Sequence, residues 1–176
     1  PWEGAKADIK FAWLEGEFLE FVQNEINVEQ RGATSITLVR EIDNSGNRLL
    51  NAPRFTVNLS AEQTVPIGSF GSLTARWDGA WKDESFYDAS EGTGIPNTFG
   101  VDFIPSPALG QSDFWIHNIR LSYATPDTNL VVSGWVRNLT DQVYRTFSAD
   151  LSTFARSTLN FVGDPRTYGF TVALKF

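Results

Sequence analysis

The sequence contains no cysteine and only one histidine, His117. The lack of cysteine excludes disulfides, thiol catalysis and cysteine-ligated metal sites. A single histidine likewise excludes a histidine-rich metal site and any catalytic triad that uses another histidine. No run of 18 or more apolar residues exists, so a transmembrane helix is excluded. A membrane protein made of this sequence must be a barrel, because only helices and closed barrels satisfy their backbone groups in lipid.

Basic residues are also scarce. The chain has 14 Lys and Arg against 21 Asp and Glu, a formal net charge of -7. Nucleic-acid binding requires clustered Lys and Arg, so no nucleic-acid partner is expected. The opening segment, PWEGAKADIKF, has no initiator methionine, basic n-region or apolar h-region. We therefore expect any targeting signal to have been removed or to lie outside this piece.

Aromatic residues, by contrast, are abundant, with 14 Phe and 6 Trp in 176 residues. Such a composition suits a barrel that places aromatic side chains at the two membrane interfaces. The aromatic core of a soluble β-sandwich accounts for the composition equally well. The mean hydropathy of -0.20 is compatible with both, because the lipid-facing and lumen-facing residues of a barrel average out.

Period-two alternation dominates the chain, which indicates β-strands and no amphipathic helix. The clearest segment is 167–176, in which Tyr168, Phe170, Val172, Leu174 and Phe176 share one face. Five other alternating segments cover residues 6–13, 54–62, 72–82, 118–123 and 130–137. Trp115 and His117 would point to the apolar side near the upper end of the fourth of these six strands.

The charged residues of the six segments fall on the face opposite the apolar residues. They include Lys6, Asp8, Lys10, Arg76, Asp78, Arg120, Arg137 and Lys175. A membrane barrel requires this arrangement, since a Lys or Arg on the lipid face costs about 2–4 kcal/mol at the midplane. A sandwich with one solvated face predicts the same arrangement. The alternation therefore predicts a β-fold more strongly than it predicts a membrane.

The connections between the six segments discriminate better. Two are short turns, at residues 66–71 and 125–129, and three are long, at about 19–52, 85–112 and 148–164. Short and long connections alternate, as they do in outer-membrane barrels with short periplasmic turns and longer extracellular loops. Long structureless loops are rare in compact soluble domains. The alternation favours a transmembrane antiparallel β-barrel with its C-terminus in the periplasm.

Three stretches resemble the C-terminal region of TonB-dependent outer-membrane receptors. The first begins at Asn51 with Asn-Ala-Pro-Arg, and the third is GDPRTYGFTVALKF. The second contains the hallmark of a basic residue followed by Asn-Leu-Thr-Asp and a tyrosine, which here are Arg137, Asn138, Leu139, Thr140, Asp141 and Tyr144. Together the three stretches cover about two-thirds of the chain.

The resemblance implies that residues 1–176 are the last six strands of a barrel of about 22 strands, without the plug domain and the earlier strands. It implies a receptor in the outer membrane of a Gram-negative bacterium, among lipid and lipopolysaccharide. A TonB-type energy-coupling protein would drive uptake of a siderophore, cobalamin or oligosaccharide. The alternating residues from Tyr168 to Phe176 would form the signal read by the barrel-assembly machinery.

In such a receptor the extracellular loops contact the ligand. Exposed aromatic and charged loop residues are the candidates, because aromatic rings suit sugars and aromatic chelates and arginine suits anionic chelates. They are Arg40, Glu41, Asp43, Tyr87, Phe99, Phe103 and Arg156. No catalytic constellation is found, so we expect no enzyme, no cofactor and no metal site.

Several weaker motifs favour structural interpretations. The segment 43–47 resembles a calcium loop but lacks its full spacing and closing Glu. Asn138-Leu139-Thr140 matches a glycosylation sequon and is better explained by a strand end that turns at Asp141. Two functional alternatives remain open. One is a soluble carbohydrate-binding β-sandwich, with Trp77, Trp81 and Trp135 in a core or a sugar platform; the other is a porin-like passive channel.

Overall fold

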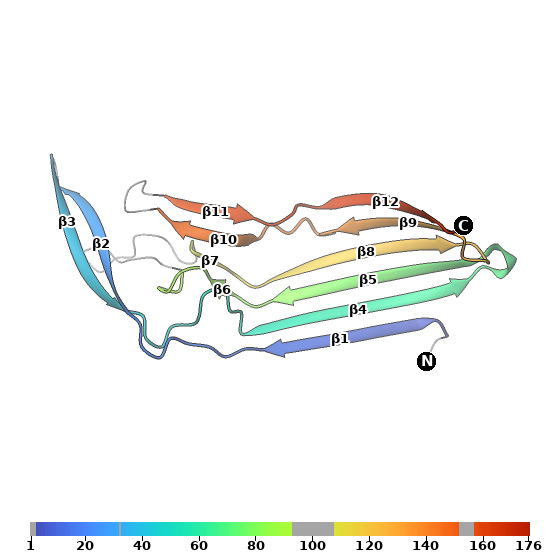
Figure 1. Cartoon of the computed structure of the whole chain (residues 1–176), viewed down its shortest axis with the longest axis horizontal. Coiled ribbons are helices and arrows are strands. Elements are labelled where there is room, and N and C mark those ends of the chain that lie inside the picture. Colours follow the sequence, from blue (N-terminus) through green and yellow to red (C-terminus); the bar gives the residue numbers. More distant parts are fainter. Residues whose placement is uncertain (1–2, 32, 93–107, 152–156) are drawn as a thin grey trace.

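A single six-stranded antiparallel sheet makes up most of the chain, whose computed structural model describes residues 3–31, 33–92, 108–151 and 157–176. Figure 1 shows the strands side by side along the length of the molecule. Their spatial order is β1 (Ala5–Trp13), β4 (Phe55–Pro66), β5 (Ser72–Lys82), β8 (Phe114–Ala124), β9 (Leu130–Arg137) and β12 (Thr167–Leu174). Each strand pairs with its neighbour along this order.

Three two-stranded hairpins lie within the long connections, at one end of the sheet (Figure 1). They are β2 (Val22–Arg31) with β3 (Thr34–Asp43), β6 (Ser85–Phe86) with β7 (Gly110–Gln111), and β10 (Arg145–Asp150) with β11 (Thr158–Val162). We call this end the hairpin end. The opposite end, the turn end, carries the short connections 66–71 and 125–129, the first of which contains the 3-10 helix η1 (Gly68–Phe70).

The six predicted strands and the alternation of short and long connections are confirmed, with corrections to the strand bounds. β4 continues beyond the predicted residue 62 to Pro66, and β8 begins at Phe114 instead of residue 118. β12 ends at Leu174, two residues before the predicted end. The long connections, which were predicted as loops, contain hairpins because their backbone groups also require partners.

The register sorts the side chains onto two faces. Residues paired across an antiparallel sheet point to the same side, and one continuous row joins Ala7, Ala61, Trp77, Ile119, Val136 and Tyr168. The adjacent row joins Lys6, Glu62, Arg76, Arg120, Trp135 and Gly169. We call the face of the first row the outer face and the face of the second row the inner face.

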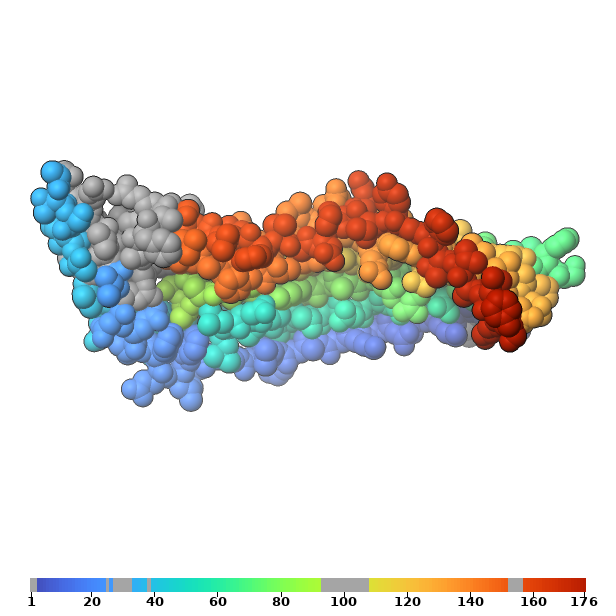
Figure 2. All heavy atoms as spheres, turned by 45° about the horizontal axis from the view of Figure 1, so that its top comes forward, coloured from blue at the N-terminus to red at the C-terminus, as the bar shows by residue number. Residues whose placement is uncertain are grey.

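The apolar residues of the outer face have no protein core to cover them. Ile9 is 79% exposed, Phe11 64% and Phe170 80%, whereas a β-sandwich would bury one face of each sheet. Among the described residues, the buried apolar side chains are Phe86, Ala89 and Leu109, and all three lie at the hairpin end. Figure 2 shows that the edges of the sheet, β1 and β12, lie on opposite sides of the fragment. The fold is an open segment of barrel wall.

Candidate functional site

The inner face gathers all the charged side chains of the six sheet strands. They are Lys6, Asp8, Lys10, Glu62, Arg76, Asp78, Lys82, Arg120 and Arg137. Although the whole chain carries a net charge of -7, basic residues outnumber acidic ones on this face. A polar, charged inner face and an apolar outer face are what a membrane barrel requires.

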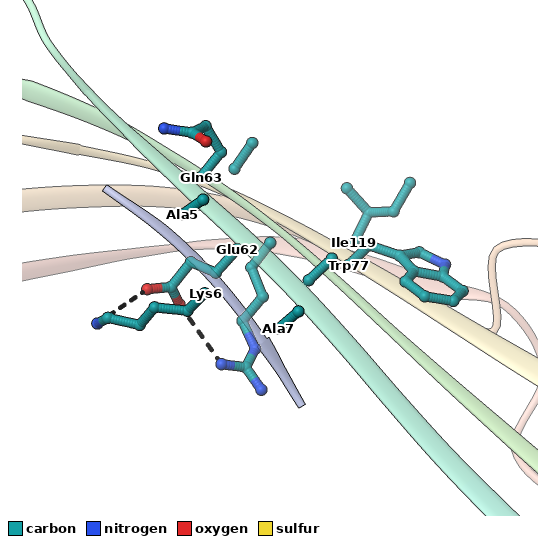
Figure 3. Close-up of a pocket in the computed structure, with 10 residues that line it drawn as sticks. Ala5, Lys6, Ala7, Glu62, Gln63, Trp77 and Ile119 are labelled. Atoms are coloured by element: carbon teal, nitrogen blue, oxygen red, sulfur yellow. Dashed lines mark hydrogen bonds and ion pairs between the residues drawn. The ribbon is translucent and has the colours of Figure 1, made fainter. Parts of the chain in front are cut away.

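The acidic groups of the inner face are already engaged. Glu62 lies 3.4 Å from both the Lys6 ammonium and the Arg76 guanidinium. Arg76 also reaches Asp78, with its Nη2 2.7 Å from Oδ1 and its Nε 3.0 Å from Oδ2. In Figure 3 the Lys6 and Glu62 side chains point away from those of Trp77 and Ile119. The wall thus holds a fixed charge network near the turn end of β1.

A second part of the inner face forms two polar hollows that share Asp78 and Asn118. One, of about 290 Å³, is lined by residues of β1, β4, β5 and β8, among them Asp8 and Lys10. The other, of about 150 Å³, lies between β5, β8 and β9 and is lined by Asp78, Asn118, Ile119, Arg120, Trp135, Val136 and Arg137.

The Trp135 indole is part of the lining of the smaller hollow. Its ring lies against Gly169, so that a Cβ on residue 169 would come within 2.6 Å of the Trp135 Cζ2 atom. The Arg137 guanidinium carbon lies 5.1 Å from the centre of the Trp135 ring, within the range of a cation–π interaction. Glycine at position 169 therefore leaves room for the indole beside β12.

Asn138, directly after β9, ties β8 to the connections that precede β10 and β12. Its Nδ2 donates to the Gln142 and Asp164 carbonyls, at 2.9 and 3.1 Å, and its Oδ1 accepts from the Gln142 N–H at 2.8 Å. Its own N–H donates to Asn118 Oδ1 at 3.0 Å. Asn138 is 4% exposed and has φ +50°, a left-handed conformation that asparagine tolerates well. The sequon is thus explained by structure, and the predicted turn at Asp141 (φ +54°) is confirmed.

His117 lies on the outer face between two tryptophans, as the alternation predicted. Its ring stacks on Trp77 and on Trp115, with centroids 5.7 and 5.6 Å apart. Gly79 is its paired residue on β5, and the missing side chain there leaves room for the Trp77 ring. Stacked aromatic rings on the outer face, near the hairpin end of β8, are typical of the aromatic girdle that membrane barrels place at the membrane interface.

The predicted ligand-binding residues are spread over separate hairpins. Arg40, Glu41 and Asp43 lie exposed on β3. Hydrogen bonds from the Ser45 hydroxyl and from the Ser45 N–H, which lies 2.9 Å from Asp43 Oδ1, lower the pKa of the Asp43 carboxyl. Tyr87 instead packs on Phe147, with centroids 6.1 Å apart. Phe99, Phe103 and Arg156 lie outside the described residues. The structure does not bring Tyr87 and the β3 residues into one site.

The Tyr87 hydroxyl has a structural role. It donates to the Arg145 carbonyl at 2.7 Å, and burial raises the pKa of the phenol. Arg145 in turn donates from its Nη1 to the Gly110 carbonyl, and its backbone N–H donates to Gln111 Oε1. Tyr87 and Arg145 thereby hold the β6–β7 and β10–β11 hairpins together.

Arg48 was not singled out in the sequence, yet it links two of the long connections at the hairpin end. Its Nη2 lies 2.7 Å from Glu84 Oε1 and its Nε 3.7 Å from Glu91 Oε1. The guanidinium also lies over the Phe86 ring, 4.6 Å from its centre. Its partners are 36 and 43 residues away, so only tertiary structure reveals this cluster.

The outer face carries the predicted assembly residues of β12. Tyr168, Phe170, Val172 and Leu174 are 79%, 80%, 53% and 59% exposed, and Phe176 follows the strand. A further hollow of about 870 Å³ lies among Ala5, Ala7, Ala61, Ala75, Trp77 and Ile119, with Lys6, Glu62, Gln63 and Arg76 also on its lining (Figure 3). Small side chains beside large ones account for its shape.

No helix among the described residues is long and apolar enough to cross a membrane. No group of three or more His, Asp or Glu side chains in the described segments is arranged to hold a metal ion.

Comparisons with known proteins agree with this geometry. The family model described as "TonB dependent receptor-like, beta-barrel" matches residues 5–139. The crystal structure of the ferric yersiniabactin uptake receptor FyuA from Yersinia pestis superimposes with a TM-score of 0.64 at 17% sequence identity. The match covers 99% of this chain and 21% of that one, so the chain spans about a fifth of its structural neighbour. No curated protein sequence matches the chain.

Proposed function

The chain belongs to the TonB-dependent receptor β-barrel family, and we propose that it is the lumen-lining wall of an outer-membrane importer for a scarce nutrient. The observation that carries the proposal is the division of the sheet into two faces. All charged side chains of the six sheet strands lie on the inner face, while apolar side chains such as Phe11 and Phe170 stay exposed on the outer face. Hydrocarbon is the environment that stabilises such an outer face.

The proposed orientation puts the hairpin end outside the cell and the turn end, with the C-terminal end of β12, in the periplasm. Outer-membrane barrels have short periplasmic turns and longer extracellular loops. The 3-10 turn at Gly68–Phe70 and the turn at 125–129 fit the periplasmic side. The three hairpins, with the cluster around Arg48 and Tyr87, fit the outside. In a closed barrel of about 22 strands, β1 and β12 would pair with further strands.

The proposed ligand is a metal chelate such as a siderophore, with cobalamin and an oligosaccharide as the other classes to be tested. The name of the structural neighbour, a ferric yersiniabactin receptor, makes a ferric chelate the first probe. The basic excess of the inner face supports an anionic ligand. Arg40, Asp43 and Tyr87, with Phe99, Phe103 and Arg156 beyond the described residues, remain proposed ligand contacts at the mouth.

The proposed partners follow from the family. A TonB-type protein would supply energy through parts of the receptor that precede this segment. The barrel-assembly machinery would read the outward-facing residues Tyr168, Phe170, Val172, Leu174 and Phe176 during insertion. The aromatic stack of Trp77, His117 and Trp115 would face lipid and lipopolysaccharide at the outer interface.

The test is uptake by cells that carry or lack the whole receptor. Iron-55 chelates of a catecholate, a hydroxamate and a phenolate siderophore would be supplied separately, with cobalamin and maltodextrin in parallel. We expect one probe to enter only cells with the receptor, and entry to stop when an uncoupler collapses the proton-motive force. Uptake that ignores the uncoupler would indicate a passive porin-like channel. A receptor recovered in the aqueous fraction without detergent would indicate the soluble sandwich.

Cysteine labelling tests the orientation separately. The segment has no native cysteine, so single substitutions in it report on their own positions once any cysteine elsewhere in the receptor is replaced. Ser45→Cys, at the hairpin end, is expected to react with a membrane-impermeant maleimide on intact cells. Ser69→Cys, in the turn at the other end, is expected to react only after the outer membrane is opened. The reverse labelling pattern would contradict the orientation.

A further inference from the structure

The three long connections lie together at the hairpin end (Figure 1), and the middle one contacts both of the others. We call their described residues the first connection (14–31 and 33–54), the middle connection (83–92 and 108–113) and the last connection (138–151 and 157–166). We propose that the middle connection couples its two neighbours, so that all three lose and regain their structure as one cooperative unit. The inference concerns contacts within this segment and does not depend on what the receptor transports.

The first connection is fixed to the middle one over a short stretch of each. Two hydrogen bonds of 2.7 Å join them, from Asn47 Nδ2 to the Ala89 carbonyl and from the Asn51 N–H to the Phe86 carbonyl. The Arg48 N–H also donates to Glu91 Oε1 at 3.0 Å, in addition to the ion pairs of the Arg48 guanidinium. Backbone groups and a charged side chain thus hold the base of the β2–β3 hairpin against the middle connection.

The last connection is held by the middle one through Arg145. The Tyr87 hydroxyl donates to the Arg145 carbonyl at 2.7 Å. The Arg145 N–H donates to Gln111 Oε1 at 2.6 Å, and its Nη1 donates to the Gly110 carbonyl at 2.9 Å. Tyr87 directly follows β6, while Gly110 and Gln111 form β7. Both strands of the middle hairpin therefore contribute to the contact.

The middle connection is packed firmly enough to transmit a change from one neighbour to the other. Leu109 is 0% exposed and Phe86 is 8% exposed. The Tyr87 N–H donates to the Leu109 carbonyl at 2.8 Å, and the Leu109 N–H donates to the Gly92 carbonyl at 3.2 Å. Phe86, under the Arg48 guanidinium, is adjacent to Tyr87, which binds the last connection. Because adjacent residues bind opposite neighbours, the release of one neighbour loosens the support of the other.

Hydrogen exchange of the whole receptor in detergent micelles tests the coupling. Where amide exchange follows the opening equilibrium, a cooperative unit exchanges with one common opening constant. Arg48→Gln is expected to speed exchange about fivefold in peptides from all three connections, since it removes a charged group with several partners. The peptides cover residues 44–49, 85–92 and 145–150. Among the described residues the Arg48 side chain has no hydrogen bond or ion pair with the last connection, so a faster exchange at 145–150 must be transmitted.

Tyr87→Phe tests the coupling in the opposite direction. The substitution removes the hydrogen bond to the Arg145 carbonyl and keeps the ring that packs on Phe147. Because coupling between two sites is reciprocal, we expect exchange at 44–49 to rise by the same factor as exchange at 145–150. The Tyr87 side chain has no hydrogen bond to the first connection within the described part of the chain, so this rise would also be transmitted.

Arg166→Gln is the matched control, because the ion pair and hydrogen bonds of Arg166 stay within the last connection, on Asp141 and Leu139. We expect it to leave exchange at 44–49 and 85–92 within about a factor of two. Unchanged exchange in β5 would show that the wall is folded in each variant.

Four results would overturn the coupling. They are an effect of Arg48→Gln that does not reach 145–150, an effect of Tyr87→Phe that does not reach 44–49, no effect of either substitution, and an equal rise in all three peptides with Arg166→Gln. Energy-dependent uptake is measured independently, so failure here leaves the proposed transport function intact.

Discussion

The Trp135 indole occupies the space that a side chain on Gly169 would fill. These residues are paired across β9 and β12, and an added Cβ at position 169 would lie 2.6 Å from Cζ2 and 3.1 Å from Cε2 of the indole. Because Arg137 lies over the same ring, the indole is constrained from both sides. A glycine on one strand and a tryptophan on the next thus fit together beside the smaller inner-face hollow.

Gly169→Ala is therefore expected to destabilise the barrel by about 1–3 kcal/mol, the usual cost of inserting a methyl group into a packed site. Gly134 is the matched control, since it lies beside Phe170 on the outer face and a Cβ there meets no atom within 4 Å. We expect Gly134→Ala to change stability by no more than about 0.5 kcal/mol. Denaturant unfolding of the whole receptor in lipid, followed by gel mobility, would compare them; equal midpoints would contradict the packing.

Substitution of Asn138 is expected to loosen the hairpin end. Asn138→Ala removes three side-chain hydrogen bonds and places alanine in a left-handed conformation, at a cost of about 2–4 kcal/mol. Asn138→Gly keeps the conformation accessible and removes only the hydrogen bonds, so it should cost less. Unfolding midpoints of both variants would separate the two contributions. A glycine variant as unstable as the alanine variant would show that the conformation is unimportant.

A lysine should be tolerated on one face of β4 and not on the other. Leu59 points to the outer face, and Asn58 is an exposed residue of the inner face. Leu59→Lys is expected to cost about 2–4 kcal/mol if the outer face meets hydrocarbon, while Asn58→Lys should change stability little. The yield of each variant that folds into lipid vesicles, measured over a series of urea concentrations, would give both stability changes. Similar losses in the two variants would remove the distinction between the faces.

The turn at 125–129 is expected to open at acid pH. Hydrogen bonds from the Thr125 hydroxyl (2.7 Å) and from the Asn129 N–H and Nδ2 lower the pKa of the Asp127 carboxyl below its ordinary value of 3.8. A carboxyl with a lowered pKa stabilises the fold above its ordinary value, and this contribution is lost as the pH falls through the folded-state pKa.

Hydrogen exchange of the turn peptide, corrected for the intrinsic rate, should therefore increase below pH 3.8. Asp127→Asn is expected to abolish this pH dependence. The turn at 66–71 contains no carboxyl group and serves as the internal control. An equal increase in both turns would indicate general acid unfolding and contradict the role of Asp127.

Much of the fold could be predicted because the membrane imposes a strict period of two. The bounds of β5 and β9 were predicted correctly. In β5, apolar residues alternate with polar or charged residues over most of Ser72–Lys82. In β9, the run of small or apolar residues that begins at Leu130 ends at Arg137. The outward position of His117 also followed from parity. Its contact with Trp77 required the tertiary structure, because Trp77 belongs to another strand and reaches it across Gly79.

The hairpins and the hollow could not be predicted for related reasons. In β2–β3 the apolar residues Ile26 and Val39 are paired, but their neighbours Asn24 and Glu41 on the same face are polar. A hairpin surrounded by water does not require a uniformly apolar face, so the alternation there is weak. Arg120, Trp135 and Arg137 come together through the β8–β9 register. A shift of the strand pairing by one residue would move the side chains of the shifted strand to the other face. The sequence does not reveal the register that prevents this.

The central claim is that the outer face of the sheet contacts hydrocarbon. Spin labels on Asn58→Cys and Leu59→Cys of the whole receptor in lipid bilayers would test it, with collision rates measured for oxygen, which concentrates in lipid, and for a water-soluble nickel chelate. We expect the label at position 59 to collide frequently with oxygen, and the label at position 58 to be less accessible to oxygen and more accessible to the nickel chelate. A label at position 59 that is shielded from both reagents would place Leu59 in a protein interior and contradict the membrane wall.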